Sequence, residues 1–109
     1  MKDPSYLRKV RLLPCAACLS DTSDQHRDPH HLMRGVNRGL SKKGPDNRVI
    51  PLCRKCHNLV HESGAELIFL ANHHIENPVE LSKTLFDVAA DATLGRRAII
   101  KSKIPKGKA

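Results

Sequence analysis

The sequence of 109 residues has very few aromatic side chains and no long apolar run. It contains three aromatic residues, Tyr6, Phe69 and Phe86, and no tryptophan. This scarcity argues against recognition of nucleic-acid bases by stacking on aromatic rings. No run reaches the roughly 18 apolar residues of a membrane helix, and the segment Met1–Ser5 lacks the apolar core of a secretory signal. We therefore expect a cytoplasmic protein.

The chain also has few apolar residues from which to build a large core. Apolar residues make up 39% of the sequence, which fits one small domain whose surface stays largely in contact with water. Domains of this size often need a staple such as a bound metal. Four cysteines are available, and cytoplasmic thiols stay reduced, so paired Cys-x-x-Cys motifs there indicate metal binding rather than disulfides.

Acidic residues are scarce at both ends of the chain, and the formal net charge is +8. Residues 1–61 carry 12 Lys/Arg against 5 Asp/Glu, and residues 62–94 carry one Lys against six acids. Residues 95–109 carry six basic residues and no acid. A basic excess indicates an acidic partner, and nucleic acid is the default. The basic end fits either a solvated tail or a segment that grips DNA.

Two Cys-x-x-Cys pairs carry the strongest signal in the sequence. Cys15 and Cys18 form the first pair, and Cys53 and Cys56 form the second after a gap of 34 residues. A two-residue spacer lets both thiolates of a pair converge on one ion, so the two pairs predict a tetrahedral structural zinc. The gap exceeds the roughly 15–20 residues of a simple zinc ribbon, so a further segment is inserted between the pairs.

Four histidines accompany the cysteines: His30 and His31 in the inserted segment, and His57 and His61 after the second pair. His57 and His61 are four residues apart, so on a helix they share one face and can chelate one ion. Four cysteines would already saturate the zinc. A second metal held by two or three histidines would keep positions open for water and substrate, as catalytic metal sites do.

The adjacency of His30 and His31 suggests that the two side chains have different roles. Neighbours on an extended strand point to opposite sides, so one can contact the metal and the other the attacking water. Imidazole suits the second task because its unperturbed pKa of about 6.5 lies near working pH. A competing assignment is a Cys2His2 zinc built from the first cysteine pair and the two later histidines. It leaves Cys53 and Cys56 without a role.

The pattern around these residues predicts two short strands followed by a helix. Pro29–Met33 and Arg48–Leu52 are β-prone segments, and residues 34–46 between them are expected to form a long loop because they are rich in Gly, Lys and Asn. A helix is expected to start near His57 and to end or kink at Gly64.

Two further helices are expected after this point. Ala65–Ile75 presents a broad apolar face, and a second helix opens with Asn77 as N-cap and Pro78 as its first residue. Both are most simply explained as packing support. The apolar stripe of the second helix is Leu81, Leu85, Val88 and Ala89. Little fixed structure is expected from Gly95 onward.

Three segments carrying these residues resemble the HNH endonucleases. They read Asp28-Pro29-His30-His31-Leu32, Asp46-Asn47 and Pro51-Leu52-Cys53-Arg54-Lys55-Cys56-His57-Asn58-Leu59-Val60-His61. The similarity covers about residues 12–62 and points to the small zinc-containing HNH proteins of phages and prophages, including recombination-associated nucleases. It implies an α+β fold with a ββα-metal motif braced by a four-cysteine zinc site. The two C-terminal helices and the basic tail are then appended to this motif.

The resemblance also implies a role for each site residue. His31 is similar to the general base that activates water, and Asn47 to the central Asn that orients this base or assists metal binding. The ligands implied for a catalytic divalent cation (Mg²⁺, Mn²⁺, Ni²⁺ or Zn²⁺) are His30, His57 and His61. The ligands implied for the structural Zn²⁺ are Cys15, Cys18, Cys53 and Cys56.

The sequence departs from the family pattern at the central Asn. The family usually places it five residues before the first cysteine of the second pair, where this chain has Arg48, and Asn47 lies six residues before that cysteine. A one-residue bulge would reconcile the spacing. Alternatively, Asp46 carries part of the role, because the segment Lys43-Gly-Pro-Asp46 fits the Lys-x-x-Asp pattern of some relatives.

The expected function is therefore hydrolysis of DNA phosphodiester bonds, with DNA held mainly through its phosphate backbone. The domains expected are an HNH core at 1–63, a helical extension at 64–94 and a flexible basic tail at 95–109. The alternative is a non-catalytic zinc-binding DNA-binding module. A third hypothesis is a protein-interaction domain that uses the helices at 65–91. The basic residues expected to contact phosphates are Arg27, Arg34, Arg38, Lys42, Lys43 and Arg48.

Overall fold

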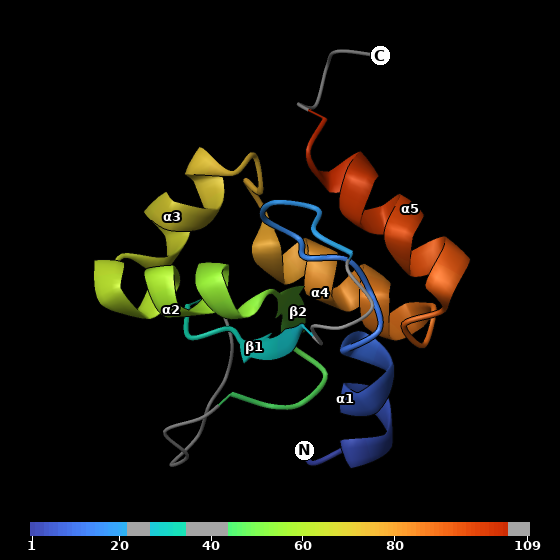
Figure 1. The fold of residues 1–109 in the computed structure, drawn as a ribbon. Coiled ribbons are helices and arrows are strands. Elements are labelled where there is room, and N and C mark those ends of the chain that lie inside the picture. Colours follow the sequence, from blue (N-terminus) through green and yellow to red (C-terminus); the bar gives the residue numbers. More distant parts are fainter. Residues whose placement is uncertain (22–26, 35–43, 105–109) are drawn as a thin grey trace.

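The computed structural model describes residues 1–21, 27–34 and 44–104, and its fold is α+β. A two-stranded sheet lies at the centre, with α2 and α3 to its left and α1 and α5 to its right in Figure 1. No helix in these three ranges is long and apolar enough to cross a membrane. The elements in chain order are α1 (Pro4–Val10), β1 (Asp28–His31), β2 (Val49–Leu52), α2 (Arg54–Ser63), α3 (Glu66–Asn72), α4 (Pro78–Asp87) and α5 (Ala92–Ser102).

The two predicted strands are confirmed and pair antiparallel. His30 lies opposite Ile50, and His31 lies opposite Val49. Every residue of β2 is buried, because α2 and α4 both pack against this strand. Successive side chains of a strand point to opposite faces. His30 and His31 therefore enter different surroundings, and His30 is the more deeply buried of the two.

Helix α2 begins at Arg54, three residues before the expected start, and ends as predicted at Gly64. Gly64 has a φ of 64°, a left-handed conformation that glycine adopts without the Cβ clash of other residues. Cys56 and Val60 lie on the buried side of the helix. His57 and His61 each follow one of these residues, so they share the adjacent stripe.

Helices α3 and α4 confirm the expected extension in part. Asn77 caps α4, since its side-chain oxygen accepts a hydrogen bond from the Glu80 amide at 3.2 Å, and Pro78 is the first helical residue. The broad apolar face expected for α3 is wrong in detail. Leu70 is fully buried, but Leu67 and Ile68 are 49% and 65% exposed. Helix α3 packs mainly against α2, and its buried side is formed by Glu66 and Leu70.

The expectation that residues from Gly95 onward lack fixed structure is wrong, because α5 extends to Ser102. Three helices follow α2 rather than two. The Asp91 side chain caps α5 by accepting from the amides of Thr93 and Leu94, and Ile99 is fully buried. A Cβ at Gly95 would meet Leu13 at 2.8 Å, so glycine permits this close packing. Residues 105–109 of the expected tail lie outside the described ranges.

Helix α1 was not predicted, although its local signal is present. Asp3 accepts from the Tyr6 amide at 3.1 Å and Pro4 opens the first turn, which is a favourable helix start. Tyr6 is buried and makes an edge-to-face contact with Phe86, with ring centroids 5.0 Å apart. This contact attaches α1 to the helical extension.

A single hydrophobic core joins the motif and its extension. It includes Val10 of α1, Ile50 of β2, Leu85 of α4 and Ile99 of α5. Residues of the predicted core at 1–63 and of the predicted extension at 64–94 therefore pack together. Helix α4 of the extension packs against β2, which pairs with the strand that carries His30 and His31.

Candidate active site

The four cysteines come together in one cluster. Their Sγ atoms all lie within 4.8 Å of one another, and the Sγ atoms of Cys18 and Cys53 are 3.8 Å apart. A tetrahedral zinc with Zn–S bonds of about 2.3 Å places its sulfurs roughly 3.8 Å apart. The cluster can therefore hold a structural metal ion such as zinc, as the spacing of the two pairs predicts.

The backbone shapes both halves of this cluster. In the first half, the Cys18 amide donates to Cys15 Sγ at 3.4 Å, and Leu19 adopts a left-handed φ of 64° that turns the chain back. In the second half, Cys53 is the N-cap of α2 and Cys56 lies in its first turn. Burial is the main cause that raises the pKa of the Cys15 and Cys56 thiols. Thiolates at these positions need a cation to compensate their charge.

One lysine from the far end of the chain lies beside the cysteine cluster. Lys103, at the end of α5, donates from Nζ to the carbonyl oxygen of Ala17 at 2.8 Å and to that of His73 at 2.7 Å. Burial lowers the pKa of Lys103, while the neighbouring thiols of Cys15 and Cys18 act in the opposite direction. Its ammonium group is thus placed where it can offset thiolate charge.

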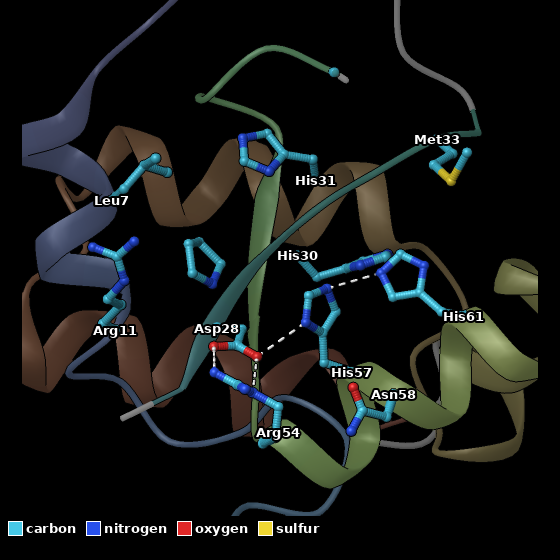
Figure 2. A pocket seen from close by; sticks show the side chains of 12 residues that line it. Leu7, Arg11, Asp28, His30, His31, Met33, Arg54, His57, Asn58 and His61 are labelled. Atoms are coloured by element: carbon cyan, nitrogen blue, oxygen red, sulfur yellow. Dashed lines mark hydrogen bonds and ion pairs between the residues drawn. The ribbon is translucent and has the colours of Figure 1, made fainter. Parts of the chain in front are cut away.

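The three predicted histidine ligands form a second cluster beside the neighbouring stripe of α2. His30, His57 and His61 offer ring nitrogens that all lie within 4.8 Å of one another. The Nε2 atoms of His57 and His61 are 3.1 Å apart, and Figure 2 shows these two rings facing each other above α2. Two nitrogens bound to one tetrahedral zinc at about 2.05 Å lie roughly 3.3 Å apart. The spacing fits two ligands of a single ion.

A carboxylate holds His57 from behind. Asp28 Oδ2 lies 3.0 Å from His57 Nδ1, and the same carboxylate accepts two hydrogen bonds from Arg54, at 2.9 and 3.3 Å. Burial alone would raise the pKa of Asp28, but the hydrogen bonds from Arg54 and His57 outweigh it and lower the pKa. An ionised Asp28 keeps the proton of His57 on Nδ1. The lone pair of Nε2 is then directed at the histidine cluster.

A second carboxylate holds His30. Glu66 Oε2 lies 2.8 Å from His30 Nε2, while His30 Nδ1 is buried and has no hydrogen-bond partner within the described ranges. Burial alone would raise the pKa of Glu66, but the hydrogen bonds from His30 and from the amides of Arg34 and Met33 lower it. An orphaned buried nitrogen is costly unless something binds it. This atom is suited to be the third metal ligand.

His31 stands apart from the cluster. In Figure 2 it lies on the other side of β1 from His30 and His57. Its Nε2 is 2.8 Å from Asp46 Oδ1, and Asp46 Oδ2 accepts from the Asp3 amide at 2.7 Å. Asp46 therefore occupies the position beside His31 that was considered for either Asp46 or Asn47. The role suggested for Asn47 stays a prediction, and its carbonyl oxygen accepts from Arg48 at 2.7 Å.

A pocket of about 720 Å³ is lined by the three-histidine cluster and by His31. Arg11, the C-cap of α1, and Arg54 of α2 contribute positive charge to its lining (Figure 2). The pocket is thus continuous from the three-histidine cluster to His31 and is bordered by cations. The other residues that line it are Leu7, Asp28, Pro29, Met33, Gly44 and Asn58.

The basic residues predicted to contact DNA have different outcomes. Arg27 is 5% exposed and donates from Nε to the Leu13 carbonyl at 2.7 Å, so its guanidinium braces the interior instead of facing a ligand. Arg34 is exposed, and Arg48 is half-buried. The remaining three lie outside the described ranges: Arg38, Lys42 and Lys43.

Three site residues were not assigned a role from the sequence. Asp28 could have been found, because it lies two residues before His30 and therefore on the same face of β1. Arg54 follows Cys53 in the first turn of α2, and its pairing with Asp28 depends on the strand pairing. Glu66 has no local signal, because it is one of six acids in the segment 62–94 and reaches His30 only through the tertiary fold.

Comparison with known proteins places this chain in a family without giving it an activity. A family described as "Protein of unknown function (DUF968)" matches residues 1–92. An uncharacterized protein of Escherichia coli strain K12, YdfU, is 43% identical over 56 residues. That alignment covers 51% of this chain and 15% of YdfU, so the chain matches a small part of the longer relative. No solved structure gives a significant match.

The matched region takes in both ligand clusters. It includes the four cysteines, the histidines at 30, 31, 57 and 61, and the carboxylates of Asp28 and Glu66. It ends at the first residue of α5. Because residues 1–92 are most of the sequence, this chain belongs to the DUF968 family.

Proposed function

We propose that the chain is a metal-dependent endonuclease of the HNH type that hydrolyses DNA phosphodiester bonds. The observation that carries the proposal is the convergence of three imidazole nitrogens on one point, with a fourth histidine held separately at the same pocket. The hairpin of β1 and β2 followed by α2 is the order of elements that the HNH resemblance implies. The four-cysteine cluster would hold structural zinc.

The histidine cluster has the donor set of an incompletely ligated cation. Asp28 and Glu66 each occupy one ring nitrogen of a histidine, which leaves the other nitrogen free to bind metal. Such carboxylate–histidine pairs fix the ring and its tautomer at metal sites. A divalent cation bound by three nitrogens would supply Lewis-acid stabilisation of the charge that develops on phosphate oxygens.

His31 is the general base in this proposal. Its contact with Asp46 through Nε2 leaves Nδ1 as the nitrogen that takes a proton from water. The water oxygen then attacks phosphorus in line as the bond from phosphorus to the 3′ oxygen breaks, and the departing oxygen takes a proton from solvent water, which leaves a 5′ phosphate and a 3′ hydroxyl. Asp46 holds the ring in place from behind, and its second oxygen is fixed by the backbone of α1. The separation of His31 from the metal ligands lets one group bind the cation while the other moves the proton.

The substrate phosphates would be held by charge instead of by base recognition. Arg11 and Arg54 line the pocket. Arg34 is exposed and lies three residues after His31, the last residue of β1. Contacts of this kind position the DNA backbone without reading sequence and weaken as salt rises. We therefore propose cleavage with little sequence preference.

The decisive experiment is a plasmid-nicking assay of the zinc-loaded protein with Mg²⁺, Mn²⁺ or Ni²⁺. We expect His31→Ala to lower the cleavage rate about 10²- to 10⁴-fold, because a positioned base contributes an acceleration of that size. Zinc content and Ni²⁺ binding should stay near those of the wild type. Nicking by the wild type should be lost in EDTA and restored when the divalent ion is added back.

His74→Asn is the matched control for this assay. His74 is exposed and has a φ of 65°, a conformation that asparagine tolerates, so the variant should cut as the wild type does. Equal cutting by His31→Ala and the wild type would contradict the assignment of the base. Retention of DNA without cleavage by the wild type would instead support the non-catalytic DNA-binding module.

A further inference from the structure

The structure assigns to Glu66 the role of positioning His30 as a metal ligand. Helix α3, which begins at Glu66, therefore contributes a residue to the histidine site. This inference rests on the cation site of the proposed function. Glu66 is the first residue of α3, a helix outside the ββα unit, and it reaches back to the middle of β1. No other described carboxylate approaches His30 within hydrogen-bond distance.

Glu66 is buried and makes contacts with both of its oxygens. It is 9% exposed, and its Oε2 atom lies 2.8 Å from His30 Nε2. Its Oε1 atom accepts from the backbone amide of Arg34 at 3.1 Å, and the Met33 amide lies 3.2 Å from each oxygen. All partners of this carboxylate other than the histidine are therefore backbone N–H groups, which can only donate.

These contacts determine which nitrogen of His30 carries the proton. A carboxylate that accepts from backbone amides is an acceptor toward the imidazole as well, so Nε2 must be the donor. In the neutral ring the lone pair then lies on Nδ1. That atom is buried, unpartnered among the described residues, and belongs to the ring that clusters with His57 and His61. Glu66 thereby selects the tautomer that can bind a cation.

The same geometry sets the direction of the ring. His30 is 2% exposed and its ring stands at steep angles to both neighbours, with centroids 5.3 Å from His57 and 5.7 Å from His61. A ring that turned over about its Cβ–Cγ bond would exchange Nε2 with Cε1 and lose the hydrogen bond to Glu66. The carboxylate at 2.8 Å opposes that turn. Preorganisation of this kind strengthens metal binding because no reorientation is needed.

A purely structural role is the competing explanation, since Glu66 also ties the end of β1 to α3 through two amides. Glu66→Gln separates the two roles. The carboxamide oxygen can still accept from the amides, so the tie between β1 and α3 is largely kept. The carboxamide NH₂ can donate to His30 Nε2, which allows the tautomer with its proton on Nδ1.

The test is titration of the zinc-loaded protein with Ni²⁺, followed by calorimetry, for the wild type and Glu66→Gln. We expect the Ni²⁺ affinity of Glu66→Gln to fall about 10- to 100-fold, as for other partners of metal-bound histidines. The thermal unfolding midpoint should change much less than it does when a cysteine ligand is removed. Glu76→Gln is the control, because Glu76 is exposed and loses the same charge.

The tautomer is measured directly by ¹H–¹⁵N correlation spectra of the histidine rings before Ni²⁺ is added. We expect the wild type to carry the His30 proton on Nε2, and Glu66→Gln to populate the Nδ1-protonated form. An unchanged Ni²⁺ affinity in Glu66→Gln would overturn the inference, and so would a wild-type proton on Nδ1. Neither reading depends on whether DNA is cut.

The outcomes separate this inference from the proposed function. Weakened Ni²⁺ binding by Glu66→Gln in a protein that never nicks DNA would support Glu66 and contradict the nuclease proposal. Nicking by the wild type, together with identical Ni²⁺ affinity in both proteins, would do the reverse. Absence of any Ni²⁺ binding at the three histidines would overturn both.

Discussion

The cysteine cluster and the histidine cluster share helix α2, yet they are built in opposite ways. Cys15 and Cys56 are buried, and four thiols of one cluster leave no position for a further ligand. The histidine cluster offers three ligands, and its edge at His61 is exposed to a pocket of about 720 Å³. The same helix thus contributes ligands to a closed site, as structural metal sites are, and to an open site, as the proposed catalytic function requires.

The two clusters also differ in the charge that surrounds them. Four thiolates around a divalent zinc carry a net negative charge, and Lys103 lies beside them. Neutral imidazoles add no negative charge to a divalent ion, and the carboxylates of Asp28 and Glu66 contact the rings of His57 and His30. With a divalent ion bound, the open site of the proposed function would therefore suit an anionic substrate better than the closed one would.

The largest expected effect is the loss of folding when the closed site is broken. Cys53→Ser should abolish tight zinc binding, and structural zinc supplies on the order of 10 kcal/mol in small zinc domains. We therefore expect a largely unfolded chain in the circular dichroism spectrum at room temperature. Lys55→Ala, an exposed change on the same helix, should fold normally. A Cys53→Ser protein that is folded and stable would contradict the claim that the fold depends on the cysteine cluster.

Breaking the open site should affect metal binding but not the fold. His57→Ala removes one of three ligands and leaves Asp28 paired with Arg54. We expect the Ni²⁺ affinity to fall at least 10-fold, while zinc content stays at that of the wild type and the unfolding midpoint shifts only slightly. Calorimetry and metal analysis measure the two quantities separately. If His57→Ala lost zinc as well as nickel, the two clusters would not bind their metals independently, which would contradict this prediction.

The smallest expected effect comes from the lysine beside the closed site. Lys103→Met removes the donor to the carbonyl oxygens of Ala17 and His73. We expect it to cost about 1–2 kcal/mol of unfolding free energy, because a typical hydrogen bond contributes about 0.5–1.5 kcal/mol net and two are lost. Zinc should also be released faster to a chelator. Lys101→Met, exposed on the same helix, is the control, and equal release rates in the two variants would contradict this role.

The parts of the fold that follow local rules were predictable from the sequence. The spacing of the cysteine pairs and histidines led to both ligand clusters, and the Asn77-Pro78 start of α4 was read from capping chemistry alone. Gly64 ended α2 for the same kind of reason. The caps depend on neighbours within a few residues, and each cluster contains a ligand pair with its own short spacing, so a sequence shows both directly.

The parts that depend on tertiary contacts were missed. Helix α5 was expected to be unstructured because its residues are basic, but Ile99 is buried in the core and Gly95 lets Leu13 approach closely. Arg27 was assigned to DNA by its charge, although the fold buries it against the Leu13 carbonyl. Glu66 reaches His30 over 36 residues, and a count of acids in its segment gives no hint of that. Charge alone predicts exposure only where packing does not intervene.

The direct succession of Cys56 and His57 on α2 fixes the angular phase between the two ligand sets. Each residue of an α-helix advances the chain by about 100° and 1.5 Å. One residue inserted between Cys56 and His57 would rotate His57 and His61 by about a quarter-turn away from β1. The four thiols could still bind their metal ion. We therefore expect insertions and deletions at this junction to disrupt the histidine cluster, whereas the segments between the elements can tolerate them. The helix fixes the orientation of the histidine ligands relative to the cysteine ligands.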